Sequence, residues 1–167
     1  MTPAQTPQTT IVGKDEQSTL VIPGPGEYLV VLDAPGAEVT ISGVFSTEGT
    51  DIHNVSIIIH HRAPHTRATT EFRGVARDKS QLRLYGKIVI DEHCPDVQSF
   101  LTERILLLSD EAKAEAVPEL EILSDDVKCS HAASVSRIPE SQLFYLMSRG
   151  LSHRQAEEMV VEGFLEI

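Results

Sequence analysis

The chain has 167 residues, of which 41% are apolar and only 5% aromatic, with no tryptophan. This length suits one domain with a small appendage, and a core filled mainly by valine, isoleucine, leucine and alanine suits layered β structure. The formal net charge of −11 repels nucleic acid phosphates and anionic membranes, and because the basic residues form no cluster we expect neither as a partner.

Two features of the sequence bear on where the protein works. The two cysteines, Cys94 and Cys129, are too few for a disulfide framework or a four-cysteine metal site. Residues 1–10 lack the basic segment and apolar run of a signal peptide, and no apolar stretch approaches the length of a membrane span. We therefore expect a cytoplasmic protein, in which free thiols persist, and a disordered tail over the polar residues 1–10.

Between residue 11 and about residue 108 the sequence predicts a series of short strands. Runs of four to eight residues, rich in valine, isoleucine, leucine and threonine, are separated by glycine, proline, aspartate or asparagine. AEVTISG (37–43) and QLRLYG (81–86) alternate polar and apolar residues, which indicates one buried face. NVSIIIHH (54–61) carries a continuous apolar run, which is typical of a more deeply buried strand.

Two architectures accommodate strands without intervening helices. Such strands are normally antiparallel, as in a sandwich, because parallel pairs need long crossovers. A β-solenoid is the exception, since each turn of the chain pairs with the next. No exact internal repeat is visible to support a solenoid, so the pattern alone slightly favours the sandwich.

The pattern changes near Pro139, after which two short helices are predicted. Proline suits the first position of a helix, and Gly150 suits the end of one. Ser152 and Gln155 fit a capping box that begins the second helix. We therefore divide the chain into a tail (1–10), a β core (11–138) and a C-terminal helical segment (139–167).

Six blocks of sequence, spread over roughly two thirds of the chain, resemble one known family. They are APHTRATTEFRGVARDKS (63–80), LYGKIVI (84–90), LLLSDEAKAEAVPELEI (106–122), DDVKCSHAASV (125–135), SQLFYLMSRG (141–150) and LSHRQAEEMVVEGF (151–164). They are similar to the SufB/SufD family of iron–sulfur cluster assembly scaffold proteins, in a shortened form close to the C-terminal part of SufD. The resemblance implies a right-handed parallel β-helix (β-solenoid) with a C-terminal pair of short α-helices, and it replaces the sandwich.

The same resemblance implies a non-enzymatic scaffold or partner subunit in iron–sulfur cluster assembly. Family members pair through their β-helices, so we expect this chain to pair with itself or with a paralogue. Their C-terminal helices dock a SufC-like ABC-type ATPase. A transient iron–sulfur cluster is expected at the subunit interface, with no tightly bound cofactor. The two helices carry more large apolar side chains than they can bury between themselves, and these are the candidate docking residues: Phe144, Tyr145, Met147, Met159, Val160 and Phe164. The alternative interpretation is that they cap the open end of the β stack.

Cys129 and His131 are the candidate ligands for a metal or cluster. They lie two residues apart, so on a strand both side chains point to the same face, where a thiolate and an imidazole can share iron or zinc. They also match the Cys-x-His of the SufD-type motif. Two ligands do not complete a site, so a second chain has to supply the rest. The alternative interpretation is a buried cysteine beside a surface histidine.

The remaining histidines leave two alternatives open. Pro64 disfavours a helix around His61 and His65, so we interpret these histidines as structural, bonding across adjacent coils.

The segment 91–96 is rich in potential ligands and departs from the family pattern. One alternative is a diverged β-helix binding module without cluster assembly activity. The other is a cupin-like metal-dependent enzyme with His61, His65 and His93 as ligands.

Overall fold

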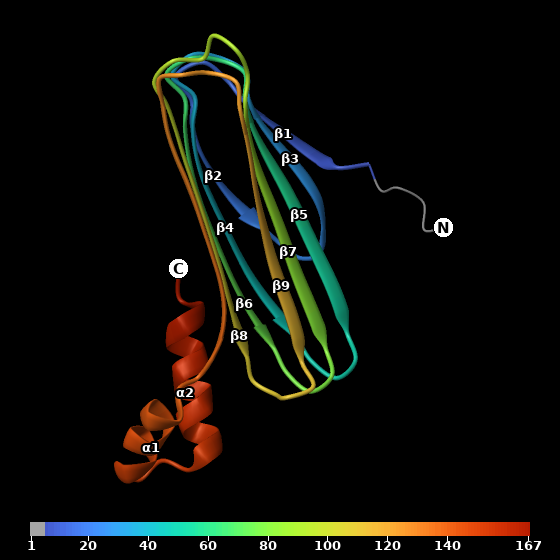
Figure 1. Ribbon diagram of the computed structural model, residues 1–167, viewed down its shortest axis with the longest axis vertical. Helices are drawn as coiled ribbons and strands as arrows, with labels where there is room; N and C mark the ends of the chain where they lie inside the picture. The colour runs from blue at the N-terminus through green and yellow to red at the C-terminus, as the bar shows by residue number, and fades with distance from the viewer. Residues whose placement is uncertain (1–5) are drawn as a thin grey trace.

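The computed structural model describes residues 6–167, which form ten β-strands followed by two α-helices (Figure 1). The strands are β1 (Gln8–Val12), β2 (Gln17–Ile22), β3 (Gly26–Leu32), β4 (Glu38–Thr47), β5 (Ile52–His61), β6 (Arg67–Ala76), β7 (Gln81–Ile90), β8 (Val97–Leu107), β9 (Lys113–Ile122) and β10 (Val127–Arg137). The helices are α1 (Glu140–Ser148) and α2 (His153–Leu165).

The chain winds into a flattened solenoid whose two walls are β-sheets that face each other (Figure 1). The odd-numbered strands form one sheet in the order β1-β3-β5-β7-β9, and the even-numbered strands form the other in the order β2-β4-β6-β8-β10. Every strand pair is parallel. The β-solenoid implied by the family resemblance is thus confirmed, and the sandwich slightly favoured by the pattern alone is wrong. Each strand pairs with the strand one coil away, so no helix is needed for a crossover.

The core fills the lumen between the sheets with columns of stacked side chains. Val30, Ile59 and Ile88 are register partners in successive coils, 29 residues apart, and each is at most 2% exposed. Parallel pairing in register places each inward residue on its counterpart in the next coil, so apolar residues of neighbouring coils bury one another.

One corner of the coil is repeated in the sequence. It is a four-residue turn with proline in second place, and its third residue has a positive φ. The three turns are 34–37, 63–66 and 94–97, with Gly36 (φ 77°), His65 (φ 60°) and Asp96 (φ 55°) at the left-handed position. Glycine adopts this left-handed conformation without strain. Other residues adopt it rarely, and histidine and aspartate are among those that do so most often.

Two expectations about the strands are corrected. The strands β4 to β10 have 10 or 11 residues each, longer than the predicted four to eight, because polar residues at outward positions do not interrupt them. Of the expected N-terminal tail, residues 1–5 lie outside the described residues, whereas residues 8–10 belong to β1. Parallel pairing with β3 supplies the backbone partners of this polar segment.

The two helices lie outside the solenoid, beside the sheet that contains β6 and β8 (Figure 1). The predicted capping box of Ser152 and Gln155 is confirmed at the start of α2. Val161 of α2 packs against Val75 and Leu106 of the solenoid. By contrast, α1 has no buried residue and packs against α2. The strands end at Arg137 and α1 begins at Glu140, whereas the division into separate domains stays an interpretation.

Candidate functional site

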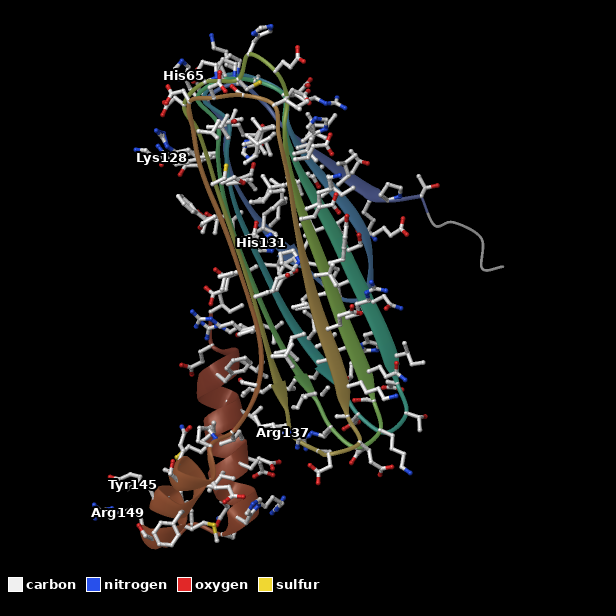
Figure 2. The ribbon with its side chains drawn as sticks, in the orientation of Figure 1. His65, Lys128, His131, Arg137, Tyr145 and Arg149 are labelled. Atoms are coloured by element: carbon white, nitrogen blue, oxygen red, sulfur yellow. The ribbon has the colours of Figure 1, made fainter. Side chains whose placement is uncertain are left out.

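Cys129 and His131 both face the lumen from β10, the last strand of the solenoid. Burial alternates over the first half of this strand, where the two residues are partly buried while Ser130 between them is exposed. The Cys129 side chain packs against the main core, and the His131 side chain is only 5% exposed. Figure 2 shows His131 between the two sheets. The shared face predicted from the spacing is confirmed, and the alternative of a surface histidine is wrong for His131.

A third residue, Glu103 of β8, joins this pair and was missed by the sequence reasoning. Its side chain is 0% exposed, and its Oε2 lies 3.5 Å from Nε2 of His131. The signal was present in the sequence, because Glu103 interrupts the inward-facing series Ser99, Leu101 and Ile105 of an alternating strand. A glutamate at a core position needs a partner of its own.

Burial keeps both cysteines in the neutral thiol form. Desolvation raises the pKa of Cys129, opposed in part by a backbone hydrogen bond at Ser99. Desolvation also raises the pKa of Cys94, and the nearby charge of Asp91 adds to the rise. Because a metal binds the thiolate, Cys129 becomes a ligand only when a metal ion displaces its proton.

His61 is held inside the core by two hydroxyl groups. Its Nδ1 lies 2.8 Å from Oγ1 of Thr66 in the same coil, and its Nε2 lies 3.0 Å from Oγ of Ser99 in the next coil. Desolvation, with a smaller contribution from the charge of His60, lowers the pKa of His61 to about 4. Both ring nitrogens are already engaged, so this side chain is structural as it stands.

The other two histidines of the cupin-like alternative do not join His61. His65 is exposed at a corner of the solenoid (Figure 2), where its Nδ1 lies 3.1 Å from Oδ2 of Asp96 in the next coil. His93 is exposed as well. Across residues 6–167, no group of three or more histidine, cysteine, aspartate or glutamate side chains is arranged to hold a metal ion.

The six candidate docking residues of the helices fall into two sets. Four are exposed, namely Phe144 (74%), Tyr145 (56%), Met147 (42%) and Met159 (50%). Val160 and Phe164 are half-buried and, together with Met159, line an open groove of about 650 Å³ between the helices and the ends of β8 and β10. Phe164 also packs against the cluster that fixes α2 to the solenoid. Only the first set therefore presents a free apolar surface.

The last coil leaves two strand edges open. β9 and β10 are the outermost strands of their sheets at this end, so their outer backbone groups have no neighbouring strand in the described part of the chain. Apolar side chains are exposed along this coil, namely Leu120 (44%), Ile122 (39%), Leu123 (55%) and Val135 (41%). An open strand edge with apolar side chains is a template for pairing with another chain.

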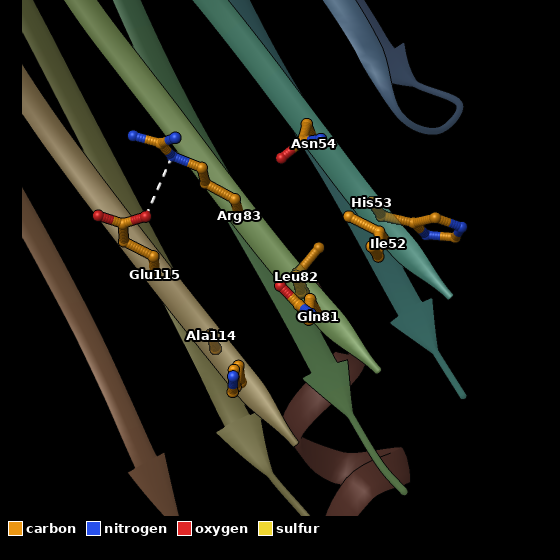
Figure 3. Close-up of a pocket in the computed structure, with 9 residues that line it drawn as sticks. Ile52, His53, Asn54, Gln81, Leu82, Arg83, Ala114 and Glu115 are labelled. Atoms are coloured by element: carbon orange, nitrogen blue, oxygen red, sulfur yellow. Dashed lines mark ion pairs between the residues drawn. The ribbon is translucent and has the colours of Figure 1, made fainter. Parts of the chain in front are cut away.

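A shallow groove of about 440 Å³ crosses the outer face of β5, β7 and β9 (Figure 3). His53, Arg83 and Glu115 lie along it, and Nε of Arg83 is 3.1 Å from Oε2 of Glu115. The groove therefore carries an exposed ion pair on its floor. Neither helix within residues 6–167 combines the length and the apolar character that crossing a membrane requires.

These features define a class of protein: a parallel β-solenoid with a thiol, an imidazole and a carboxylate in its last coils, open strand edges beside them, and a helical pair packed on its flank. The family model described as "SUF system FeS cluster assembly, SufBD core domain" matches residues 26–164. The chain therefore belongs to the SufBD family.

Individual relatives agree with this assignment. An iron–sulfur cluster assembly SufBD family protein of Staphylococcus saprophyticus is 32% identical over 127 residues, which cover 76% of this chain and 27% of that protein. The corresponding proteins of Staphylococcus epidermidis and Staphylococcus haemolyticus are each 31% identical over the same shares of the two chains. The chain thus spans about a quarter of the length of the curated relatives it matches.

Proposed function

We propose that this chain is a non-enzymatic scaffold or partner subunit in cytoplasmic iron–sulfur cluster assembly, acting by association with other proteins. The observation that carries the proposal is the family match over residues 26–164 combined with Cys129 and His131 on the inward face of the edge strand β10. The similar staphylococcal proteins are described as iron–sulfur cluster assembly proteins.

The open last coil is the proposed pairing surface. The unpaired edges of β9 and β10 and the exposed Leu120, Ile122 and Val135 support association with a second copy or a SufBD paralogue.

A transient iron–sulfur cluster at that interface is the proposed cargo. Cys129 and His131 supply a sulfur and a nitrogen donor from one chain, and the paired subunit supplies the remaining ligands. The raised pKa of the Cys129 thiol favours weak binding, because the incoming metal has to displace a proton. This agrees with a cargo that is assembled and passed on.

The exposed apolar set of the helices is the proposed docking surface for a SufC-like ABC-type ATPase. Phe144, Tyr145 and Met147 project from α1, which buries no residue of its own. Large exposed side chains of this kind are typical anchors of a protein interface. ATP hydrolysis then belongs to the partner.

Binding of the purified chain to the SufC-type ATPase of its own organism tests the proposal. The wild type is compared with the chain truncated after Ile138 and with Phe144→Ser combined with Tyr145→Ser. Both changes should abolish or strongly weaken binding. The matched control is Val21→Ser, which removes a side chain that is 70% exposed at the opposite end of the solenoid and should leave binding unchanged.

The outcomes separate the proposed function from its alternative. Binding that survives in the Phe144 and Tyr145 double variant would remove the helices as the dock. An intact chain that binds neither ATPase nor paralogue would favour a diverged β-helix module without assembly activity. Unchanged cluster assembly in a Cys129→Ser and His131→Asn variant would point to the same alternative.

A further inference from the structure

The helical pair and the solenoid form an open groove on the outside of the molecule, with a volume of about 650 Å³. Strands β8 and β10 provide one wall, and α1 and α2 provide the other. Large apolar side chains from both walls line it, namely Leu106, Ile138, Leu146, Met159, Val160 and Phe164. An uncovered concave apolar surface of this kind is typical of a binding site.

The groove has a polar end on the strands. Arg104 of β8 and Ser134 of β10 are register partners, and both line the groove. Two residues farther along each strand come Leu106 and Ser136, and Ile138 follows where the chain leaves β10 for α1. The guanidinium of Arg104 therefore lies at the end that is farther from α1, and the lining becomes more apolar towards the helices.

The charge of Arg104 is not balanced by a carboxylate. Within residues 6–167 its side chain forms no ion pair. By contrast, Arg137, which also lines the groove, lies 2.7 Å from Oδ1 of Asp110, and Arg73, the register partner of Arg104 on β6, pairs with Glu71. In a chain with net charge −11, an unpaired arginine beside an apolar groove is suited to bind an external anion, since its planar donors match carboxylate and phosphate groups.

We propose that this groove binds a small organic anion with an apolar body, of the class of acyl or aromatic carboxylates and phosphate esters. The charged head binds Arg104 and Ser134, and the body covers Leu106, Val160 and Phe164. Small-molecule sites have volumes of about 300–1,000 Å³ and an apolar lining with a few polar groups that orient the ligand. The inference goes beyond the proposed function and does not depend on it, because the groove lies outside the lumen.

A ligand in the groove would also connect α1 to the solenoid. This helix buries no residue and packs against α2, but its Leu146 lines the groove opposite Leu106 of β8. A ligand body that contacts both residues bridges the helix and the strand. Phe144 lies two residues before Leu146, on the other side of the helix, so it stays exposed. Ligand binding should therefore slow amide hydrogen exchange in α1 without covering Phe144.

Two fluorescent dyes test the head and the body separately. Anilinonaphthalene sulfonate and phenylnaphthylamine share their aromatic rings, but only the first carries an anionic group. Each is titrated into the purified full-length chain, and we expect one saturable site that binds the sulfonate dye more tightly. Arg104→Gln should weaken binding of the sulfonate dye by about tenfold or more, because a charged donor is lost. The same variant should leave the affinity for the uncharged dye unchanged.

Gly163 of α2 allows the groove to be filled without weakening the fold. It lines the groove, and no atom lies within 4 Å of the place that a Cβ would occupy. Gly163→Leu should abolish binding of both dyes, because its side chain occupies the space of the ligand body, whereas leucine is a better helix former than glycine. Gly163→Ala is the matched control, since it adds the same helix propensity with little volume and should keep the site.

Further controls separate the groove from other surfaces. Phe144→Ser removes the largest exposed side chain of α1, and Arg83→Gln removes an arginine from the groove on β5, β7 and β9. Both should leave the affinity for the sulfonate dye unchanged. Dodecanoate and dodecyl phosphate, used below their micelle concentrations, should displace the dye from the wild type, and the stronger competitor identifies the preferred head group.

Four outcomes overturn the proposal. The first is the absence of a saturable site in the wild type, which would leave the groove to a segment of a partner protein. The second is undiminished binding of the sulfonate dye by Arg104→Gln or by Gly163→Leu. The third is an equal loss in Phe144→Ser, which would place the dye on the exposed face of α1. The fourth is failure of both dodecyl anions to displace the dye. Unchanged hydrogen exchange in α1 with dye bound would refute the bridge between α1 and β8 alone.

Discussion

The imidazole of His61 joins two coils of the solenoid, with Nε2 3.0 Å from Oγ of Ser99 in the coil that follows. Nδ1 lies 2.8 Å from Oγ1 of Thr66. A hydroxyl can donate or accept, so a neutral ring, with one N–H and one lone pair, is fully satisfied here. Adding a second proton places an uncompensated charge in the core, which is why burial lowers the pKa of His61 to about 4.

The first prediction is that the free energy of unfolding decreases on acidification because of His61. In the unfolded chain the imidazole binds a proton near pH 6.5, whereas in the folded chain it does so only near about pH 4. Because the folded pKa is depressed, the contribution is fully present above the unfolded pKa and is lost as pH falls from 6.5 to 4. The difference in pKa corresponds to about 3 kcal/mol.

Urea unfolding at about pH 7 and about pH 4.5 measures this contribution. Because the carboxylates of the chain titrate in the same range, the informative quantity is the difference between wild type and His61→Asn. His61→Asn should be less stable at neutral pH and show a shallower pH dependence. His53→Asn serves as the control outside the core. An equally steep pH dependence in His61→Asn would contradict the prediction.

The second prediction concerns Arg73, which fastens α2 to the solenoid. Its Nη1 donates to the carbonyl oxygens of Phe164, at 2.8 Å, and of Glu166, and its Nη2 pairs with Glu71 at 2.6 Å. Arg73→Met keeps the aliphatic stem but removes these hydrogen bonds, which contribute roughly 1.5–3 kcal/mol when a charged group donates them. Amide hydrogen exchange should therefore accelerate in α2 and stay unchanged in β5 and β7.

Arg83→Met is the matched control, because Arg83 and Glu115 form an exposed ion pair with side chains 54% and 60% exposed. Such pairs contribute about 0–1 kcal/mol. If exchange in α2 accelerates equally in both variants, Arg73 has no special role as an anchor.

Much of the fold was predictable from the strand pattern, but the topology was not. The alternation in QLRLYG correctly assigns Leu82 and Leu84 to the lumen and Arg83 to the outside. Alternation is the same in parallel and antiparallel sheets, so it does not distinguish a solenoid from a sandwich. The missing signal was the proline of the repeated corner, at positions 35, 64 and 95, which marks coils of about thirty residues rather than a repeat of whole segments.

The candidate site was predictable only in part for a related reason. The spacing of Cys129 and His131 fixes their common face, because a strand has a period of two. Glu103 lies 28 residues from His131 in the chain, and only the register between β8 and β10 brings the two together. Likewise, the exposure of Phe144 and the internal packing of Phe164 depend on how α2 packs against the solenoid. Helical periodicity does not specify that packing.

The third prediction uses two glycines with opposite surroundings. Gly74 is buried in β6, and a Cβ there would clash with Cδ2 of Leu82 across the lumen. Gly74→Ala should lower the free energy of unfolding by about 1–3 kcal/mol through overpacking. Gly163 in α2 has no atom within 4 Å of the place that a Cβ would occupy, so Gly163→Ala should raise it by up to about 1 kcal/mol through helix propensity. Denaturant unfolding of both variants measures the two values, and effects of the same sign would contradict the packing argument.

The fourth prediction is an order of thiol reactivity. Cys94 is 2% exposed, whereas Cys129 is partly exposed on the edge strand β10, and burial raises the pKa of both thiols. Since the thiolate is the reactive form, both should react with iodoacetamide more slowly in the folded protein than in the unfolded chain, and Cys129 should react faster than Cys94. The single-cysteine variants Cys94→Ser and Cys129→Ser allow each rate to be measured by mass spectrometry. Faster labelling of Cys94 would contradict this order and would show that the corner at residues 94–97 opens more readily than the last strand. A paralogue that pairs along β10 should slow the labelling of Cys129 alone.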